Sequence, residues 1–385
     1  MQIQMLSYMN ARILFLPIAL AACFISSDLS AQKIPAKKQV LASMNLANQY
    51  FMDKWPDVSK PIVTNRERPS NIWTRAVYYE GLMAMYQVNP QPSYVGYAIR
   101  WGQAHKWGLR NGIKTRNGDD QACGQTYIDL YLLDKQPERI QQIKASIDSM
   151  KNSAKIDDWT WIDAIQMAMP VFARLGVIYQ DTSYFNRMYL MYAHTKYKQG
   201  GGLFDAKSGL WFRDKDFVPP YKEPNGENCY WSRGNGWVVA ALVRVLSILP
   251  KSDPHYQEYL SDYKAMVQAL IPLQREDGFW NVSLKDPSNF GGKELTGSAL
   301  FIYGMAWGIN QGILNKKQYL PIVIKTWNAF EKDCLHPNGF LGWVQGTGKE
   351  PKEAQPLSYT KVPDFEDFGL GCYLLAGAEI SKFKK

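Results

Sequence analysis

The chain alternates two kinds of apolar segment, each about one helix long, six times over. The first kind places apolar residues on one face and charged residues on the other, as in residues 137–154, PERIQQIKASIDSMKNSA. The second kind is rich in Gly, Ala, Met and aromatic residues and is apolar nearly all round. A helix with one apolar stripe covers a surface, whereas a helix that is apolar all round must be enclosed. Six enclosed helices alternating with six half-exposed ones predict two concentric rings, an all-α (α/α)6 barrel.

The boundaries of these helices follow from the same pattern. The half-exposed helices are expected at residues 39–55, 92–107, 137–154, 181–199, 255–274 and 316–335. The enclosed helices are expected to begin near Trp73, Asp120, Trp161, Gly234, Thr296 and Gly369. Strand-like alternation is sparse, but Leu203–Phe204 and Leu210–Arg213 predict one short hairpin. No linker divides the chain, so residues 32–385 are expected to form a single domain.

A stack of helical repeats that binds other proteins is the alternative architecture. Solenoid faces rarely carry so many Trp and Gly residues in short loops. Here such loops precede nearly every enclosed helix, so the barrel is favoured. Loops on a rigid scaffold are where functional sites are built, and these loops would share one end of the barrel.

Residues 1–31 are typical of a secretory signal peptide. Arg12 precedes an apolar run over residues 13–25, which is too short to span a bilayer as a mature helix. Cleavage after Ala31 is slightly favoured over a lipoprotein signal, which would leave a lipid anchor on Cys23. Both alternatives predict an exported protein, periplasmic, secreted or attached to the cell surface, with no transmembrane span.

Composition restricts the chemistry that is available. The net charge is +9 but there is no long basic run, which suits a small acidic substrate better than nucleic acid. The four histidines and the four cysteines beyond the signal segment are scattered, so neither a metal site nor a disulfide scaffold is expected. Phosphate-binding loops and the GxSxG and HExxH motifs are absent from the sequence. No cofactor is expected, and the sequence does not indicate an oligomeric state.

The stretch from Asp158 to Pro170 is the most informative local feature. It places the carboxyl group of Asp163 among two tryptophans, two methionines and a proline at the start of an enclosed helix. Poor solvation raises the pKa of a carboxyl group, which suits a general acid at neutral pH. Trp159 and Trp161 offer flat apolar faces for a sugar ring. The ordinary alternative is an acid in the first turn of a helix, where the helix dipole favours it.

Four other segments carry polar or aromatic residues at similar boundaries. The doublet Asp119–Asp120 supplies a second carboxylate, and Glu294 supplies a further acid. The motif WSRGNGW at residues 231–237 places a guanidinium between two indoles, and Arg213 supplies a second arginine. Each has an ordinary explanation, such as a helix N-cap or a structural ion pair. Together they favour one shared cleft.

Several of these segments resemble glycoside hydrolase family 105. The motifs that carry the resemblance are residues 119–131, 158–170, 231–237, 294–309 and 367–380, and the similarity extends over about residues 41–382. Members of this family are unsaturated rhamnogalacturonyl hydrolases, related to the unsaturated glucuronyl hydrolases. The resemblance implies an (α/α)6 barrel, in agreement with the helix pattern, and therefore a single catalytic domain over residues 32–385.

The resemblance also implies an unusual hydrolysis. The substrate would be the 4,5-unsaturated uronic acid that polysaccharide lyases leave at the non-reducing end of pectin (rhamnogalacturonan) oligosaccharides. The enzyme protonates C4 and adds water at C5 of the vinyl ether, and the resulting hemiketal opens and releases the sugar. The proton donor needs a raised pKa and a fixed position. Negative charge nearby stabilises the oxocarbenium-like cation at C5.

The resemblance assigns roles to individual residues. Asp163 would donate the proton and then accept one from the attacking water. Asp120 matches the second acid, with Asp119 as the competing choice because the register of the doublet is open. Arg233 would hold the uronate carboxylate or a hydroxyl, for which a bidentate arginine suits better than lysine. The other residues expected around the sugar are Trp231, Trp237, Trp159, Trp161, Tyr79 and Arg213.

Three other functions stay open at this stage. An unsaturated glucuronyl hydrolase would act on other lyase-generated glycans by the same chemistry. A polysaccharide lyase usually needs a Tyr or His base, and histidine is scarce in the motif loops. A carbohydrate-binding lipoprotein would explain the aromatics and arginines but not two carboxylates in apolar settings. Arg213 stands where some family members carry a histidine, which leaves the aglycone sugar undetermined.

Overall fold

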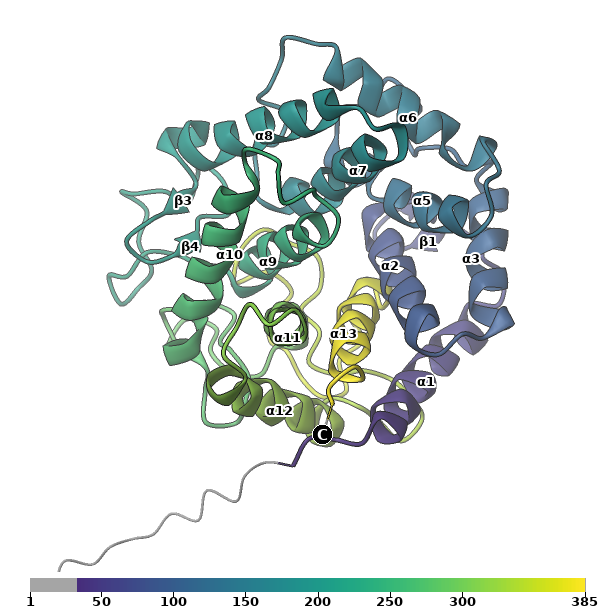
Figure 1. Ribbon diagram of the computed structural model, residues 1–385. Coiled ribbons are helices and arrows are strands. Elements are labelled where there is room, and N and C mark those ends of the chain that lie inside the picture. The colour runs from purple at the N-terminus through teal and green to yellow at the C-terminus, as the bar shows by residue number, and fades with distance from the viewer. Residues whose placement is uncertain (1–32, 385) are drawn as a thin grey trace, which may run out of the picture. The chain divides into compact units, whose positions relative to one another are not determined.

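Long helices alternate along the chain between an outer and an inner ring in the computed structural model, which describes residues 33–384 (Figure 1). The outer ring comprises α1 (Lys37–Lys54), α3 (Pro92–Ala104), α6 (Glu138–Lys151), α8 (Thr182–Tyr197), α10 (Tyr256–Leu270) and α12 (Lys316–Asp333). The inner ring comprises α2 (Trp73–Val88), α5 (Cys123–Leu133), α7 (Asp163–Tyr179), α9 (Ser232–Leu246), α11 (Leu295–Asn310) and α13 (Asp367–Ile380). The predicted (α/α)6 barrel is confirmed.

Burial differs between the two rings as the sequence pattern requires. Every residue of α13 is buried, and α11 is buried without interruption from Leu295 to Gly308. The outer helix α12 buries a single face, whose members are Tyr319, Val323, Ile324, Thr326, Trp327, Ala329 and Phe330. An amphipathic stripe therefore faces inward in the outer ring, and the inner ring is enclosed by it.

The inner ring closes where its first and last helices meet. A Cβ atom on Gly81 of α2 would lie 2.5 Å from the carbonyl oxygen of Gly371 on α13. Real Cβ atoms are not found so close to a backbone atom, so α2 and α13 can approach this closely only because both positions are glycine. This pair of glycines thus allows the first and last inner helices to meet and close the ring.

Short elements decorate this scaffold. The predicted hairpin forms from β3 (Phe204–Asp205) and β4 (Leu210–Trp211), in which Phe204 pairs with Trp211. A second pair, β1 (Ile62–Val63) and β2 (Glu67–Arg68), was not expected from the sequence. The remaining elements are the one-turn helix α4 (Gly118–Gln121) and the 3₁₀ turns η1 (Gln199–Gly201) and η2 (Ile271–Leu273).

Several sequence expectations concern the chain ends and the cysteines. The signal peptide over residues 1–31, with its two alternative cleavage positions, lies outside the described residues. Residues 33 to 384 contain no helix that is both long and apolar enough to cross a membrane. Cys123, Cys229, Cys334 and Cys372 are all buried and unpaired. In this part of the chain no three His, Cys, Asp or Glu side chains gather in a way that would hold a metal ion.

Candidate active site

A pocket of about 150 Å³ opens at the end of the barrel where inner helices begin. Trp73 and Asp163 are the first residues of α2 and α7, and Asp119 lies on α4, directly before α5. The full lining is Trp73, Asp119, Trp161, Asp163, Met167, Arg213, Thr347 and Gly348. The loops before several inner helices therefore do share one end, as the sequence predicted.

Backbone pairing between two distant segments fixes the position of Asp163. Trp161 forms an antiparallel bridge with Asp214, and the Ile162 amide donates to the Arg213 carbonyl oxygen at 3.0 Å. This pairing brings the Arg213 side chain over the start of α7. Its Nε atom lies 3.3 Å from Oδ2 of Asp163, while its Nη1 atom donates to Oδ2 of Asp214 at 2.6 Å.

The carboxyl group of Asp163 is buried but keeps unused hydrogen-bonding capacity. Burial raises its pKa, and the positive charges of Arg213 and Arg233 act in the opposite direction. Among the residues that the structure describes, none makes a well-aligned hydrogen bond to its Oδ2 atom. A buried carboxyl group with a free oxygen and a raised pKa keeps its proton to a higher pH than a solvated one and can pass it to a bound molecule.

Asp119 shares the pocket with Asp163. Burial raises the pKa of Asp119 to about 7, and the negative charge of Asp163 adds to the effect. The Asn117 side chain caps α4 by accepting a hydrogen bond from the Asp119 amide at 2.8 Å. α4 packs closely against α7 at Gly118, where an added Cβ atom would lie only 3.2 Å from Cα of Ala164. Two acids with raised pKa values thus line the same cavity.

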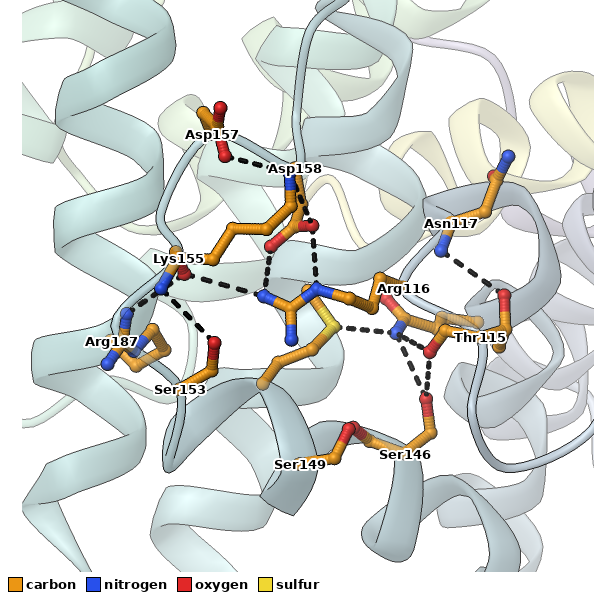
Figure 2. A network of polar contacts seen from close by, with 12 residues as sticks. Thr115, Arg116, Asn117, Ser146, Ser149, Ser153, Lys155, Asp157, Asp158 and Arg187 are labelled. Atoms are coloured by element: carbon orange, nitrogen blue, oxygen red, sulfur yellow. Dashed lines mark hydrogen bonds and ion pairs between the residues drawn. The ribbon is translucent and has the colours of Figure 1, made fainter.

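A polar network ties together the loops that precede α4 and α7, the helices that carry these two acids (Figure 2). Arg116, from the loop before α4, donates through Nε to Oδ1 of Asp158 at 2.8 Å, and its Nη2 atom bonds Oδ2 of the same carboxylate. Asp158 belongs to the loop before α7. Ser146 of α6 donates to the Thr115 carbonyl oxygen at 2.9 Å. The bidentate pair of Arg116 and Asp158 holds the loop before α4 against the loop before α7.

Asp120, which the sequence favoured as the second acid, lies in a different environment. It is fully buried and accepts hydrogen bonds from Arg110 Nε at 2.7 Å, Asn111 Nδ2 at 2.9 Å and Thr115 Oγ1 at 2.6 Å. It is not among the pocket-lining residues. Successive residues on a helix point about 100° apart, so only one member of the doublet can face the cavity. The structure therefore favours Asp119, the alternative that the sequence left open.

The WSRGNGW motif lies behind the pocket wall. Arg233 is 1% exposed, and its Nη1 and Nη2 atoms donate to the carbonyl oxygens of Gln345 and Gly346, both at 2.7 Å. Its guanidinium lies between the rings of Trp231 and Phe368, at 4.5 and 5.1 Å from their centroids. Arg233 was expected to hold the uronate carboxylate. Instead, both its terminal nitrogens are engaged by the backbone immediately before Thr347 and Gly348.

The predicted aromatic residues divide into two groups. Trp161 lines the pocket, as does the predicted Arg213. The others are buried and do not line it: Trp231 donates to Oε1 of Gln345, Trp237 packs against Trp73, Trp159 packs against Phe172, and Tyr79 stacks on Trp101. Indole and phenol rings in an apolar helix are first of all core residues, and the hydrophobic effect placed these inside.

Sequence reasoning missed four lining residues, whereas the N-cap role of Glu294 was among the alternatives it left open. Trp73 was recognised only as a helix start, although it is an aromatic at the same kind of boundary as Trp161. Met167 lies one turn into α7. Thr347 and Gly348 come from a long loop with no local signal. Glu294 took the ordinary role, because its carboxylate caps α11 by accepting from the amides of Thr296 and Gly297.

Comparisons with known proteins agree with this arrangement. The family model described as Glycosyl Hydrolase Family 88 matches residues 43–384. An unsaturated 3S-rhamnoglycuronyl hydrolase of Formosa agariphila is 31% identical over 333 residues, which cover 81% of this chain and 85% of that protein.

Two solved structures are also similar. A glycosyl hydrolase of family 88 from Bacteroides vulgatus superimposes with a TM-score of 0.81 at 31% identity, covering 90% of this chain and 99% of that one. A structure described as a polysaccharide lyase has a TM-score of 0.81 at 28% identity, covering 90% and 97% of the two chains. These matches confirm the resemblance to hydrolases of unsaturated uronyl groups that the sequence motifs indicated.

Proposed function

The chain belongs to glycosyl hydrolase family 88, and on that premise we propose that it removes a 4,5-unsaturated uronic acid from the non-reducing end of lyase-generated oligosaccharides. The observation that carries this proposal is the pair of acids, Asp119 and Asp163, with raised pKa values in one pocket beside Arg213. Protonation of carbon requires such an acid, and recognition of a uronate requires such a cation.

The proposed mechanism begins with the uronate carboxylate binding to Arg213. This binding shares the positive charge that otherwise favours ionised Asp163, so the proton affinity of Asp163 rises when substrate arrives. Asp163 then protonates C4, and its carboxylate accepts a proton from the water that adds at C5. Asp119 supports the protonated form of Asp163 and offers oxygen atoms to the sugar hydroxyls. Trp161 and Trp73 provide apolar surfaces for the ring.

The sugar beyond the cleaved bond is a finer question. Rhamnogalacturonan oligosaccharides from pectin remain our proposed substrate, because the motifs resemble the rhamnogalacturonyl hydrolases. The name of the Formosa agariphila relative, a rhamnoglycuronyl hydrolase, favours a second candidate, an unsaturated glucuronyl unit attached to rhamnose. Both candidates share the reacting group and the mechanism and differ in the uronic acid and the glycan that carries it.

A lyase is the competing activity, favoured by the similarity to a structure described as a polysaccharide lyase. A lyase creates the double bond that a hydrolase of this type destroys, so the two activities change ultraviolet absorbance in opposite directions. The test is to follow the absorbance of the unsaturated uronyl group with the purified protein. Three substrates are compared: an unsaturated rhamnogalacturonan disaccharide, an unsaturated glucuronyl-rhamnose disaccharide and intact polysaccharide.

The outcomes separate the candidates. Loss of absorbance on the first disaccharide supports the pectin-derived substrate, and loss on the second alone moves the proposal to the glucuronyl-rhamnose substrate. An increase of absorbance on intact polysaccharide would replace the proposal by a lyase. Stable absorbance on all three, together with saturable binding of a disaccharide, would indicate a carbohydrate-binding protein.

We also propose that the protein is exported. The apolar run over residues 13–25 and the small residues that follow it support this proposal. The mass of the mature N-terminal peptide would distinguish cleavage after Ala31 from a lipid-modified Cys23. Recovery of the intact residues 1–31 on cytoplasmic protein would contradict export.

A further inference from the structure

A second cavity lies inside the inner ring, away from the candidate active site. Its volume is about 300 Å³, twice that of the pocket, and the two share no lining residue. Asp163, at the start of α7, lines the pocket, whereas Arg174 of the same helix lines the cavity. The two residues are separated by about 16 Å along the helix axis. All six inner helices of Figure 1 contribute to its lining, through Glu80, Asp129, Arg174, Arg244, Tyr303 and Glu379 among others.

The polar character of this cavity stands out from the helices that form it. The inner helices are otherwise packed with apolar side chains, yet the charged side chains that these helices place in the cavity were withdrawn wholly or largely from bulk water at a cost in free energy. Glu80 is 1% exposed and Asp129 is 8% exposed. An inner ring with only a structural role would fill its axis with apolar side chains to native density. A polar occupant accounts for the departure from that rule.

The charges on the wall are balanced, and part of their hydrogen-bonding capacity is unused, because no described residue bonds Nε or Nη2 of Arg244 or Oε1 of Glu80. Arg174 Nη1 lies 2.6 Å from Oδ1 of Asp129, and Arg244 Nη1 lies 3.8 Å from Oε2 of Glu80. Lys382 pairs with Glu379 at 2.5 Å. A free anion would meet three carboxylates here, and a free cation would meet three basic groups. A hydroxyl group suits both, because it can donate to a carboxylate and accept from a guanidinium at the same time.

The remaining lining fits the rest of a sugar. Trp307, Tyr303 and Leu375 present largely buried apolar surface to the cavity, and such surface suits the C–H face of a pyranose ring. The volume is at the lower end of the range for small-molecule sites, which suits one sugar unit. Exposed side chains at Gln87, Ser247 and Lys382 belong to the lining, so the cavity reaches the surface.

We propose that this cavity is a second ligand site, which binds a neutral, hydroxyl-rich molecule of monosaccharide size. The site is separate from the proposed hydrolysis and does not depend on it. Paired acidic and basic side chains recognise the hydroxyl groups, and Trp307 and Tyr303 cover one face of the ring.

The test is a calorimetric titration of the purified protein with L-rhamnose and with D-glucose, and with phosphate and acetate as anionic comparators. We expect saturable binding of at least one neutral sugar and none of the anions. Arg244→Gln should weaken sugar binding about tenfold or more, since it removes hydrogen-bond donors from the wall. The matched variant Arg213→Gln, in the other cavity, should leave this binding unchanged.

A second variant guards against damage to the fold, because Arg244 is largely buried. Ser247→Trp adds bulk at the exposed mouth, where Ser247 directly follows α9, and should block the sugar without disturbing the ion pairs. Absence of saturable sugar binding in the wild-type protein would overturn the proposal and leave a cavity that holds water only. Sugar binding that Arg213→Gln abolishes, or that survives both Arg244→Gln and Ser247→Trp, would also overturn it. These outcomes are independent of hydrolytic activity, which is measured separately.

Discussion

Two neighbouring groups of residues, one that lines the pocket and one that lies behind it, are built from similar residue types at the same kind of position. We call the first group the pocket wall and the second the clamp. The pocket wall, defined here as Asp119, Asp163 and Arg213, meets a cavity. The clamp, defined as Trp231, Arg233 and Gln345, holds a loop. The Arg213 side chain is 19% exposed, and its Nε atom, 3.3 Å from a carboxylate oxygen, completes no aligned hydrogen bond among the described residues. Arg233 is 1% exposed, and both its terminal nitrogens are used by carbonyl oxygens.

The difference shows what makes a polar residue available for chemistry. Residue type does not distinguish the two arginines or the two aspartates, and both members of each pair are at least partly buried. Unused hydrogen-bonding capacity that faces a cavity distinguishes them, because a group whose partners are all supplied by the protein has little to offer a ligand. The four predictions below test this distinction.

The largest expected effect is that of Asp163→Asn. An amide cannot donate the proton, so kcat should fall by a factor of about 10² to 10⁴, the usual contribution of a general acid. KM and the melting temperature should change little, because the variant keeps the shape of the side chain and removes a buried, incompletely bonded carboxyl group. The measurement is the loss of ultraviolet absorbance of an unsaturated disaccharide. Retention of more than about a tenth of wild-type kcat would remove Asp163 from the mechanism.

Asp120→Asn is the matched control and should act on stability. It weakens the ion pair with Arg110 and replaces one acceptor oxygen by a donor, so unfolding free energy should fall by about 1.5–3 kcal/mol. Urea unfolding measures this change. In contrast, Asp119→Asn should spare stability at pH 7 and lower kcat/KM. If Asp120→Asn abolished activity in a stably folded protein while Asp119→Asn did not, the order inferred from the pocket geometry would be reversed.

Arg213→Gln and Arg233→Gln should separate substrate binding from positioning. Loss of the Arg213 charge should raise KM for a uronate substrate by about ten- to a hundredfold, with a smaller effect on a neutral analogue. Arg233→Gln should instead lower the melting temperature and reduce kcat/KM for the uronate substrate and the neutral analogue alike. The reason is that the loop before Thr347 loses its hydrogen bonds from the Arg233 guanidinium. Equal effects of the two variants on the uronate and the neutral analogue would erase the distinction between wall and clamp.

The smallest expected effect is in the pH dependence of stability. The pKa of Asp119 is raised to about 7 in the folded protein, so the folded state binds a proton that the unfolded chain, with an ordinary carboxyl pKa near 3.8, releases. Its contribution to stability is present at pH 4 and is lost as pH rises to about 7. The melting temperature of Asp119→Asn minus that of the wild type should therefore increase by a few degrees as the pH rises from 4 to 7. A constant difference over this range would show that Asp119 titrates normally.

Much of the fold was accessible from the sequence, and the reason is periodicity. Helices such as α13, with apolar residues all round, and helices such as α12, with one apolar face, differ in a pattern that tertiary structure does not alter. The alternation of the two kinds, six times over, left few arrangements other than two rings. The strands β1 and β2 were not predicted because each has only two residues, too few to show an alternation of apolar and polar side chains.

The site was accessible only in part. The burial of Asp163 and its place in the pocket were predictable because several of its neighbours along the chain, such as Trp161 and Met167, also surround it in the fold. Trp231, Trp237 and Tyr79 were misplaced because an apolar inner helix has residues that face the axis, the outer ring and its neighbours. Periodicity identifies the helix as enclosed but does not rank those directions. Thr347 and Gly348 carried no signal, since they reach the pocket through a loop held by a residue more than a hundred positions away.

The sequence by itself determined the number of long helices, their order in two rings, the end of the barrel where polar loops gather, and the raised pKa of Asp163. The tertiary structure alone decided which member of the Asp119–Asp120 doublet faces the cavity and which of Arg213 and Arg233 is free to bind. The physical reason is that burial and helix formation are averaged over many residues in a row. The partner of a single side chain depends instead on a few tenths of an ångström between segments far apart in the chain.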